Sequence, residues 1–267
     1  MSIRHYTPRR NRRRGISMRA MTFLYGVLGI AILLQVAYPL LDGEPLRLVT
    51  ISTVYWAAGA MATHALLTYG AKYAFTYLLA TLTFAFVIES IGVTTGWPFG
   101  VYEYDSSLGL QFLSVPIVVP FAWVMMAHPV LVAARTLTKN WAFLYGGLTL
   151  MAWDLFLDPQ MVAAGRWKWE VNGSHVPFAP EIPLSNAVGW LLTGMALIAI
   201  LNAILPFDRR KESASLLAAD LLLAWTYFAG VISNLFFFSR PGIALFAGVI
   251  LGALLLPYFF IRWLGRP

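Results

Sequence analysis

The stretch RRNRRRGISMRAMTFLYGVLGIAILLQVAYPLL at residues 9–41 joins a cluster of arginines to a long apolar segment. About 20 mostly apolar residues are enough for a helix to cross the hydrocarbon layer of a membrane. The arginines could form a nucleic-acid-binding patch, but their place directly before a spanning helix favours a topology determinant that contacts anionic lipid. No clean cleavage site follows, so a removed signal peptide is not expected. We interpret residues 1–17 as a basic cytoplasmic segment.

The rest of the chain has the same character, because 59% of its residues are hydrophobic and only 12% are charged. Soluble domains have about twice that share of charged residues. We predict an all-α, polytopic membrane protein in which residues 18–267 form a single transmembrane helical domain. About eight transmembrane helices are expected, at residues 19–41, 47–69, 72–92, 112–134, 141–158, 185–206, 214–238 and 242–263. No strand is evident, and the two long connections run from Gly92 to Gln111 and from Pro159 to Leu184.

The distribution of Lys and Arg predicts the orientation, since cytoplasmic loops retain positive charge. With a cytoplasmic N-terminus, fifteen basic residues lie on the inner side: Arg4, Arg9, Arg10, Arg12, Arg13, Arg14, Arg19, Lys72, Arg135, Lys139, Arg209, Arg210, Lys211, Arg262 and Arg266. The outer side holds four: Arg47, Arg166, Lys168 and Arg240. We therefore expect a multi-pass protein of the cell membrane with both termini in the cytoplasm and both long loops outside.

Several kinds of site are excluded by residue types that are absent or misplaced. There is no cysteine, which excludes disulfides and thiolate metal sites. The histidines show no metal-ligand spacing on a helix, which argues against a His-rich di-iron centre; they are His5, His64, His128 and His175. No Gly-rich fingerprint follows a strand, as a Rossmann-type nucleotide site requires. We therefore expect neither a metal nor a cofactor.

Carboxylates remain as the candidate chemistry, and the stretch WDLFLDPQMVAAGRWKWE at residues 153–170 holds two of them. Asp154 and Asp158 are four residues apart, so they project from one side of a helix. Two carboxylates this close do not readily ionise together, so one is expected to keep its proton and to be available as a donor. The alternative is structural, with Asp158 capping the loop before Pro159 and Asp154 bonded to a neighbouring helix. Glu89, near the outer end of the third helix, favours a site.

Aromatic and amide side chains surround these acids. The aromatic residues are Trp97, Phe99, Tyr102, Tyr104, Trp153, Trp167 and Trp169. Interfacial aromatic belts are the general explanation for such residues, but ring faces also stabilise a cation, by about 0.5–2 kcal/mol or more. Asn186 could orient a water or a carboxylate, or it could cap its helix. His64 and Asp220, near the inner ends of two helices, could form a structural hydrogen bond with each other.

Four motifs in order carry a resemblance: ESIGVTTGWPFGVYEY at 89–104, VPIVVPFAW at 115–123, WDLFLDPQMVAAGRWKW at 153–169 and IPLSNAVGW at 182–190. Together they resemble the integral-membrane carotenoid 1,2-hydratase family over about residues 80–195. The family motif residues matched are Glu89, Tyr102, Tyr104, Asp154, Asp158, Trp167, Trp169 and Asn186. One departure is visible, because Ala179, Pro180 and Glu181 stand where the family tends to have an aromatic residue and a glycine.

The resemblance implies an enzyme without a redox cofactor that adds water across the terminal C1,C2 double bond of an acyclic, lycopene-type carotenoid to give a tertiary 1-hydroxyl group. The partners that it implies are an acyclic carotenoid, water and membrane lipid, and it implies no nucleic acid. Association with other carotenoid-biosynthesis enzymes is compatible with it. Clustered acids fit such a reaction, in which a carboxylic acid protonates the alkene and water captures the cation.

Three other interpretations remain open from the sequence. A small integral-membrane lycopene cyclase begins with the same protonation, although its paired-glutamate motif is missing here. A membrane prenyltransferase would need two aspartate-rich motifs, and the chain has one, DLFLD at 154–158. A non-catalytic carotenoid-binding or transport protein would use the acids structurally.

Overall fold

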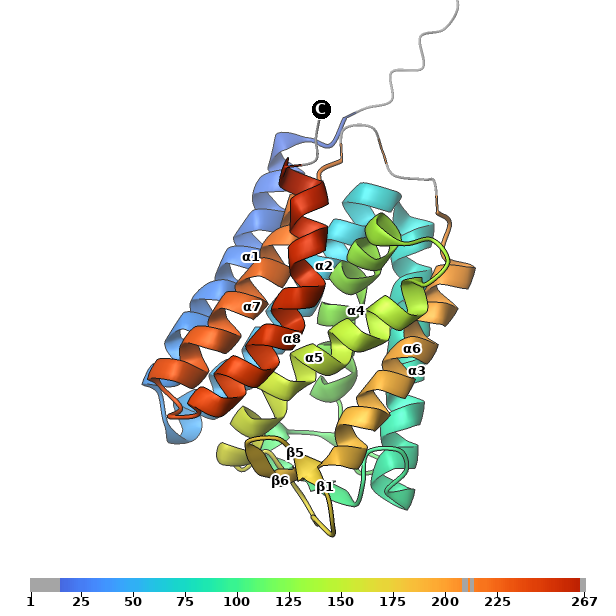
Figure 1. Ribbon diagram of the computed structural model, residues 1–267. Coiled ribbons are helices and arrows are strands. Elements are labelled where there is room, and N and C mark those ends of the chain that lie inside the picture. The colour runs from blue at the N-terminus through green and yellow to red at the C-terminus, as the bar shows by residue number, and fades with distance from the viewer. Residues whose placement is uncertain (1–14, 208–210, 212–213, 265–267) are drawn as a thin grey trace, which may run out of the picture.

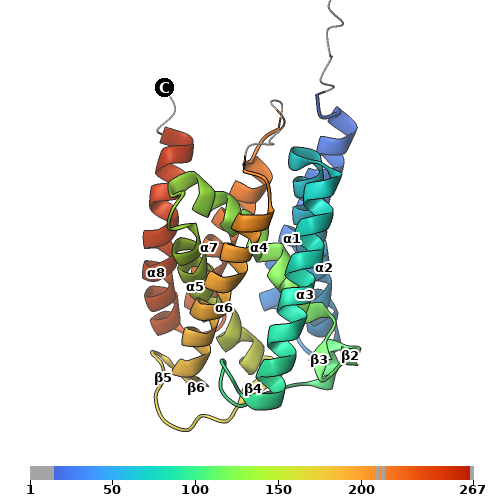
Figure 2. The same cartoon turned by 90° about the vertical axis from the view of Figure 1, so that its right-hand side faces the viewer.

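The structure is a computed structural model that describes residues 15–207, 211 and 214–264. The arginines of residues 1–14, together with Arg209, Arg210 and Arg266, lie outside the described residues, as does most of the basic segment expected at 1–17. Eight α-helices run side by side in the described part of the chain (Figures 1 and 2). They are α1 (Met18–Ala37), α2 (Gly43–Tyr69), α3 (Ala71–Thr95), α4 (Val118–Leu137), α5 (Ala142–Ala163), α6 (Leu184–Ile204), α7 (Leu217–Phe236) and α8 (Pro241–Phe259). Short helical turns extend three of the connections and ends: η1 (Tyr38–Leu40), η2 (Ser106–Leu108) and η3 (Phe260–Leu264).

The predicted all-α, multi-pass class is confirmed, and each predicted segment overlaps one of the helices. The predicted start of the fourth segment at residue 112 is wrong, because two short strands precede α4, which begins at Val118. Six are long and apolar enough to cross a membrane, and these are α1, α3, α4, α6, α7 and α8. The other two are more polar: α2, and α5, which carries the acid pair. The predicted end of α5 at residue 158 is wrong, because the helix continues through Pro159 to Ala163. Membrane helices tolerate an internal proline where neighbouring groups satisfy the freed backbone carbonyl.

Helix α5 lies at the centre of the bundle and contacts α4, α6, α7 and α8. Its closest approach is to α6, where a Cβ placed on Gly147 would lie 2.8 Å from the Leu191 carbonyl oxygen. Gly194 faces the same point, since its own Cβ would lie 3.1 Å from the Gly147 Cα. Small residues at a crossing let two membrane helices pack backbone to backbone. This crossing holds the first turn of α6 against the acids of α5.

Six short strands in the connections were not predicted from the sequence. They form three antiparallel pairs at one end of the bundle (Figures 1 and 2): β1 (Tyr102–Tyr104) with β4 (Trp167–Trp169), β2 (Gln111–Phe112) with β3 (Val115–Pro116), and β5 (His175–Val176) with β6 (Ala179–Pro183). The β1–β4 pair joins the two long connections, with Tyr102 opposite Trp169 and Tyr104 opposite Trp167. Alternation along a strand directs these four rings to one face. The two middle residues, Glu103 and Lys168, form an exposed ion pair of 2.7 Å.

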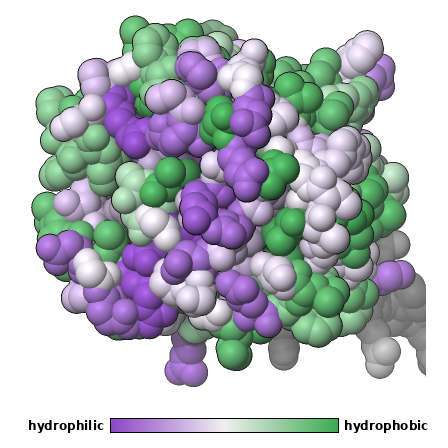
Figure 3. Space-filling model, turned by 90° about the horizontal axis from the view of Figure 1, so that it is seen from below, coloured by the Kyte–Doolittle hydropathy of each residue, from purple (hydrophilic) through white to green (hydrophobic). Residues whose placement is uncertain are grey.

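Both long connections lie at the end of the bundle opposite the start of α1 and the end of α8 (Figure 1). Seen from that end, hydrophilic residues gather over the middle of the face and apolar residues over much of its rim (Figure 3). The four basic residues assigned to the outer side from the sequence belong to this end: Arg47, Arg166, Lys168 and Arg240. A polar face above apolar helices is what a bilayer interface requires.

Topology reporters fused at Ser106 or Ser174, one in each long connection, should therefore report the outer side of the membrane. The positive-charge distribution is the physical reason. A fusion after Lys139, between α4 and α5, is the matched control and should report the cytoplasm. A cytoplasmic signal from either long connection would contradict the orientation.

The predicted pairing of His64 with Asp220 is wrong. His64 Nδ1 lies 2.8 Å from His128 Nε2, and His64 Nε2 lies 3.0 Å from the Ser215 carbonyl oxygen. Because that carbonyl can only accept, Nε2 of His64 carries the proton, and His128 donates to His64. Asp220 instead accepts hydrogen bonds from the Tyr258 hydroxyl and from Arg262, the latter at 2.8 Å.

Candidate active site

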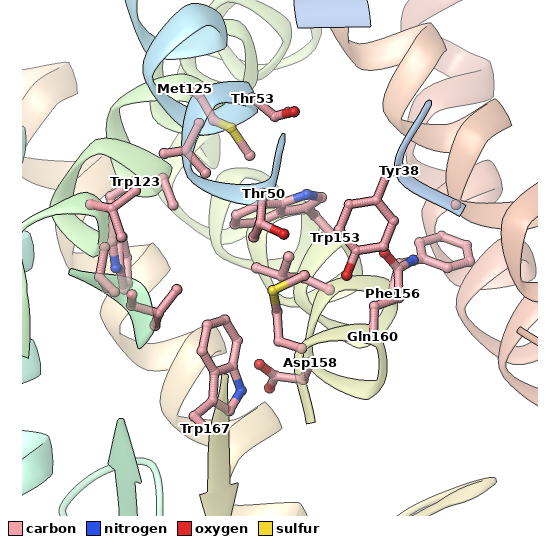
Figure 4. A pocket seen from close by; sticks show the side chains of 18 of the residues that line it. Tyr38, Thr50, Thr53, Trp123, Met125, Trp153, Phe156, Asp158, Gln160 and Trp167 are labelled. Atoms are coloured by element: carbon pink, nitrogen blue, oxygen red, sulfur yellow. The ribbon is translucent and has the colours of Figure 1, made fainter. Parts of the chain in front are cut away.

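A cavity opens inside the bundle close to the paired connections (Figure 4), and it gathers most of the predicted site residues. Those that line it are Glu89, Phe99, Tyr102, Tyr104, Trp153, Asp158, Trp167, Trp169 and Asn186. Two do not: Trp97 is 61% exposed at the surface, and Asp154 is buried behind the cavity wall. The cavity is lined by residues of α1, α2, α3, α4, α5, α6 and α7, so chain segments far apart in sequence build one site.

Asn186 joins the two aspartates. Its amide nitrogen donates to Asp154 Oδ2 at 3.1 Å and also to Asp158 Oδ2. Because one amide group reaches both carboxyls, the two carboxyls are close neighbours. The capping alternatives are wrong, since α6 begins after Pro183 without a side-chain cap and Asp158 lies within a continuing helix.

The two aspartates differ in their access to the cavity. Asp158 lines the cavity, whereas Asp154 is 1% exposed and its Oδ1 has no hydrogen-bond partner in the described part of the chain. A buried carboxylate oxygen without a partner is costly in free energy when the group is ionised and far less costly when it is protonated. The arrangement therefore suits a pair that shares one proton, with Asp158 as the member that meets a ligand.

Glu89 is held in a different way, by three donors. The hydroxyls of Tyr102 and Tyr104 each donate to Glu89 Oε2 at 2.7 Å, and the indole N–H of Trp123 donates to Oε1 at 3.0 Å. Burial and the neighbouring Glu89 carboxyl raise the pKa of both tyrosines, which keeps them protonated as donors. The three donated hydrogen bonds stabilise a negative charge on Glu89.

Trp123 and Trp190, which were not predicted as site residues, complete the aromatic wall. Trp123 and Trp190 stack with ring centroids 4.3 Å apart and planes at 11°, and Trp153 meets Trp190 edge to face at 5.7 Å. Trp123 lies in VPIVVPFAW and Trp190 in IPLSNAVGW, so membership of these motifs was the signal that could have found them. The indole nitrogen of Trp167 has no partner among the described residues, and Figure 4 shows this ring beside Asp158.

Glycine allows the connection after α3 to pack into the site. A Cβ on Gly92 would lie 2.7 Å from the Tyr102 hydroxyl, and one on Gly189 would lie 2.7 Å from Phe99. Neither contact is sterically possible, so any side chain at these two positions would displace the aromatic residues.

The segment that departs from the family pattern lies at the edge of this end of the bundle. Ala179, Pro180 and Glu181 belong to β6, and Glu181 forms an ion pair with Arg240 at the start of α8. Among residues 15–207, 211 and 214–264, no group of three or more His, Asp or Glu side chains is placed to hold a metal ion.

The chain is similar in sequence to known proteins of one family. Residues 48–255 match the family described as "Carotenoid biosynthesis protein". The chain is also 33% identical, over 172 residues, to a bisanhydrobacterioruberin hydratase from Haloarcula japonica. That alignment covers 60% of this chain and 56% of the relative, so the chain spans little more than half the length of the relative it matches. No solved structure matches the chain.

Proposed function

We propose that this chain, which belongs to the carotenoid biosynthesis protein family, is a hydratase that adds water across the terminal C1,C2 double bond of an acyclic, lycopene-type carotenoid. The observation that carries the proposal is the pair of buried aspartates joined by Asn186 at the wall of an aromatic cavity. The similarity of the chain to a named hydratase supports the same class of reaction.

In the proposed first step, a proton moves from the aspartate pair to C2 of the alkene. Asp158 delivers it, because Asp158 reaches the cavity and Asp154 does not. The π electrons form the new C2–H bond and leave a tertiary cation at C1. Asn186 keeps the two carboxyl groups adjacent while their shared negative charge increases. General acid assistance of this kind contributes about 100- to 10,000-fold.

The cation at C1 is stabilised by the surrounding side chains. The rings of Trp167 and of the Trp123–Trp190 stack offer π faces to it. Glu89, ionised and fixed by three donors, supplies a negative charge that does not have to reorient during the reaction.

In the second step, the oxygen of a water molecule attacks C1 and forms the C–O bond of the tertiary hydroxyl. A proton of that water passes to an ionised carboxylate, the aspartate pair or Glu89. If the pair takes it, the pair is reset for the next turnover. The net reaction adds H to C2 and OH to C1, with no oxidant or metal required.

The lining of the cavity suits a neutral hydrocarbon. It contains aromatic, aliphatic and uncharged polar side chains with Glu89 and Asp158, but no Lys or Arg among the described residues. A prenyltransferase must bind a diphosphate, which requires cationic groups or a metal. The cavity therefore fits the carotenoid interpretation better than the prenyltransferase one.

Expression in a host that makes lycopene tests the proposal against its rivals. A hydratase converts the pigment into a product with a tertiary hydroxyl at C1, whereas a cyclase forms a ring and a binding protein leaves lycopene unchanged. We expect the hydroxylated product, identified by mass and by chromatography. Ring formation or an unchanged pigment, with the protein present in the membrane fraction, would contradict the assignment.

A further inference from the structure

One wall of the cavity is polar and has no part in the proton transfers proposed for the carboxylates. Three side chains form this polar wall: Tyr38 from η1, Thr50 from α2 and Gln160 from α5. Thr53 of α2 also lines the cavity, but it lies apart from them, beside Met125 (Figure 4). In Figure 4, Tyr38 and Gln160 lie on one side of the cavity, Trp123 and Trp167 on the other, and Asp158 between them. A hydrocarbon cannot form hydrogen bonds with such groups.

These polar groups keep hydrogen-bonding capacity that the protein does not use. The Thr53 hydroxyl is buried and has no partner in the described part of the chain. The Thr50 hydroxyl donates to the Leu46 carbonyl oxygen at 2.7 Å, so toward a ligand it can only accept. The Tyr38 hydroxyl can both donate to a ligand and accept from one. Gln160 adds an amide that can donate and accept and that bonds to no described residue.

Water is the ligand that this combination fits. A bound water needs two to four polar partners in a roomy site, and it satisfies buried polar atoms that lack a protein partner. Neutral hydroxyl and amide groups can hold a water without adding a negative charge that would itself react with a carbocation. The carboxylates, by contrast, are already engaged by Asn186, the two tyrosines and Trp123.

We propose that Tyr38 and Gln160 hold the water that captures the cation, and so decide whether protonation ends in hydration. This inference rests on the proposed hydratase function. When water is held there, its oxygen bonds to C1 and its proton leaves to a carboxylate. When it is not, the cation loses a proton from C2 or from a methyl group and returns to an alkene.

Turnover in deuterated water separates these two fates, because protonation places a deuterium at C2 that stays in the alcohol and in every alkene formed by loss of a methyl proton or of the original C2 hydrogen. We expect Gln160→Leu and Tyr38→Phe each to lower the ratio of hydroxylated product to deuterium-labelled alkene by about tenfold, the effect of losing one hydrogen bond. Labelling of the alkene should continue. Because both products come from the same sample, poor insertion of a variant changes their sum but not their ratio.

Two matched controls lie outside the cavity on α5, where Thr149 donates to the Tyr145 carbonyl and Tyr145 donates to the Leu254 carbonyl. Thr149→Val and Tyr145→Phe should keep the wild-type ratio. The inference is overturned if Gln160→Leu and Tyr38→Phe also keep the wild-type ratio, or if hydration and deuterium entry fall together. If these side chains bound the hydroxyl group of the product instead, their replacement would change the turnover rate and leave the ratio of hydroxylated product to labelled alkene unchanged. Absence of hydroxylated product from the wild type would instead contradict the proposed function itself.

Discussion

Replacing Asp158 with Asn is expected to lower the rate of hydration by at least about 100-fold, because Asn keeps the size and polarity of the side chain but cannot donate an acidic proton. Asp158 is the aspartate that lines the cavity, so no other member of the pair can deliver the proton directly. The measurement is the amount of hydroxylated carotenoid formed per amount of inserted protein. Asp154→Asn should also remove most activity, because it ends the sharing of one proton between two carboxyls.

Asp220→Asn is the matched control for these variants. Asp220 is equally buried and carries two hydrogen bonds, but it lies at the other end of the bundle with Tyr258 and Arg262. Its replacement should reduce the amount of folded protein more than the turnover of the protein that remains. Near-normal turnover in both Asp154→Asn and Asp158→Asn would show that the acid pair is structural.

Replacing Glu89 with Gln should lower hydration by about 100-fold, the size of effect seen when a preorganised electrostatic group is removed from an active site. The variant removes the fixed negative charge beside the cation. The amide of Gln also places N–H groups next to other donors, because Tyr102, Tyr104 and Trp123 all donate to the carboxyl oxygens of Glu89. Product formation per inserted protein is the measurement.

Tyr104→Phe separates the charge from the hydrogen bonds, since it removes one donor to Glu89 and leaves the carboxylate in place. We expect a milder loss in this variant than in Glu89→Gln. Equal losses in the two variants would mean that the geometry of the connection, and not the charge of Glu89, limits the reaction.

The helices could be predicted because an apolar run long enough to span a membrane allows few other structures. The acid pair could be predicted as well, since a spacing of four residues places Asp154 and Asp158 on one side of a helix wherever that helix lies. Their link to Asn186 was one of several alternatives that the sequence left open, because it depends on the close crossing of α5 and α6. Nothing in a single helix predicts which neighbour it meets.

The wrong pairing of His64 with Asp220 and the missed strands both concern contacts between separate segments of the chain. Each of the two residues bonds to a third helix, His64 to His128 of α4 and Asp220 to Tyr258 of α8. The β1–β4 pair was missed because its strands have three residues each, too few for a two-residue alternation to be recognised. Depth and periodicity are local properties of the sequence, whereas partners are set by the packed bundle.

The source of the hydroxyl oxygen tests the central claim most directly. A carbocation captured by solvent takes its oxygen from water, whereas a hydroxylase takes it from dioxygen and needs an oxidising centre. Turnover should therefore proceed without air, heavy oxygen from labelled water should appear at C1, and one deuterium from deuterated water should appear at C2. Heavy oxygen from labelled dioxygen in place of water would contradict the hydratase mechanism, and a ring product that carries deuterium but no oxygen would assign the chain to the cyclases.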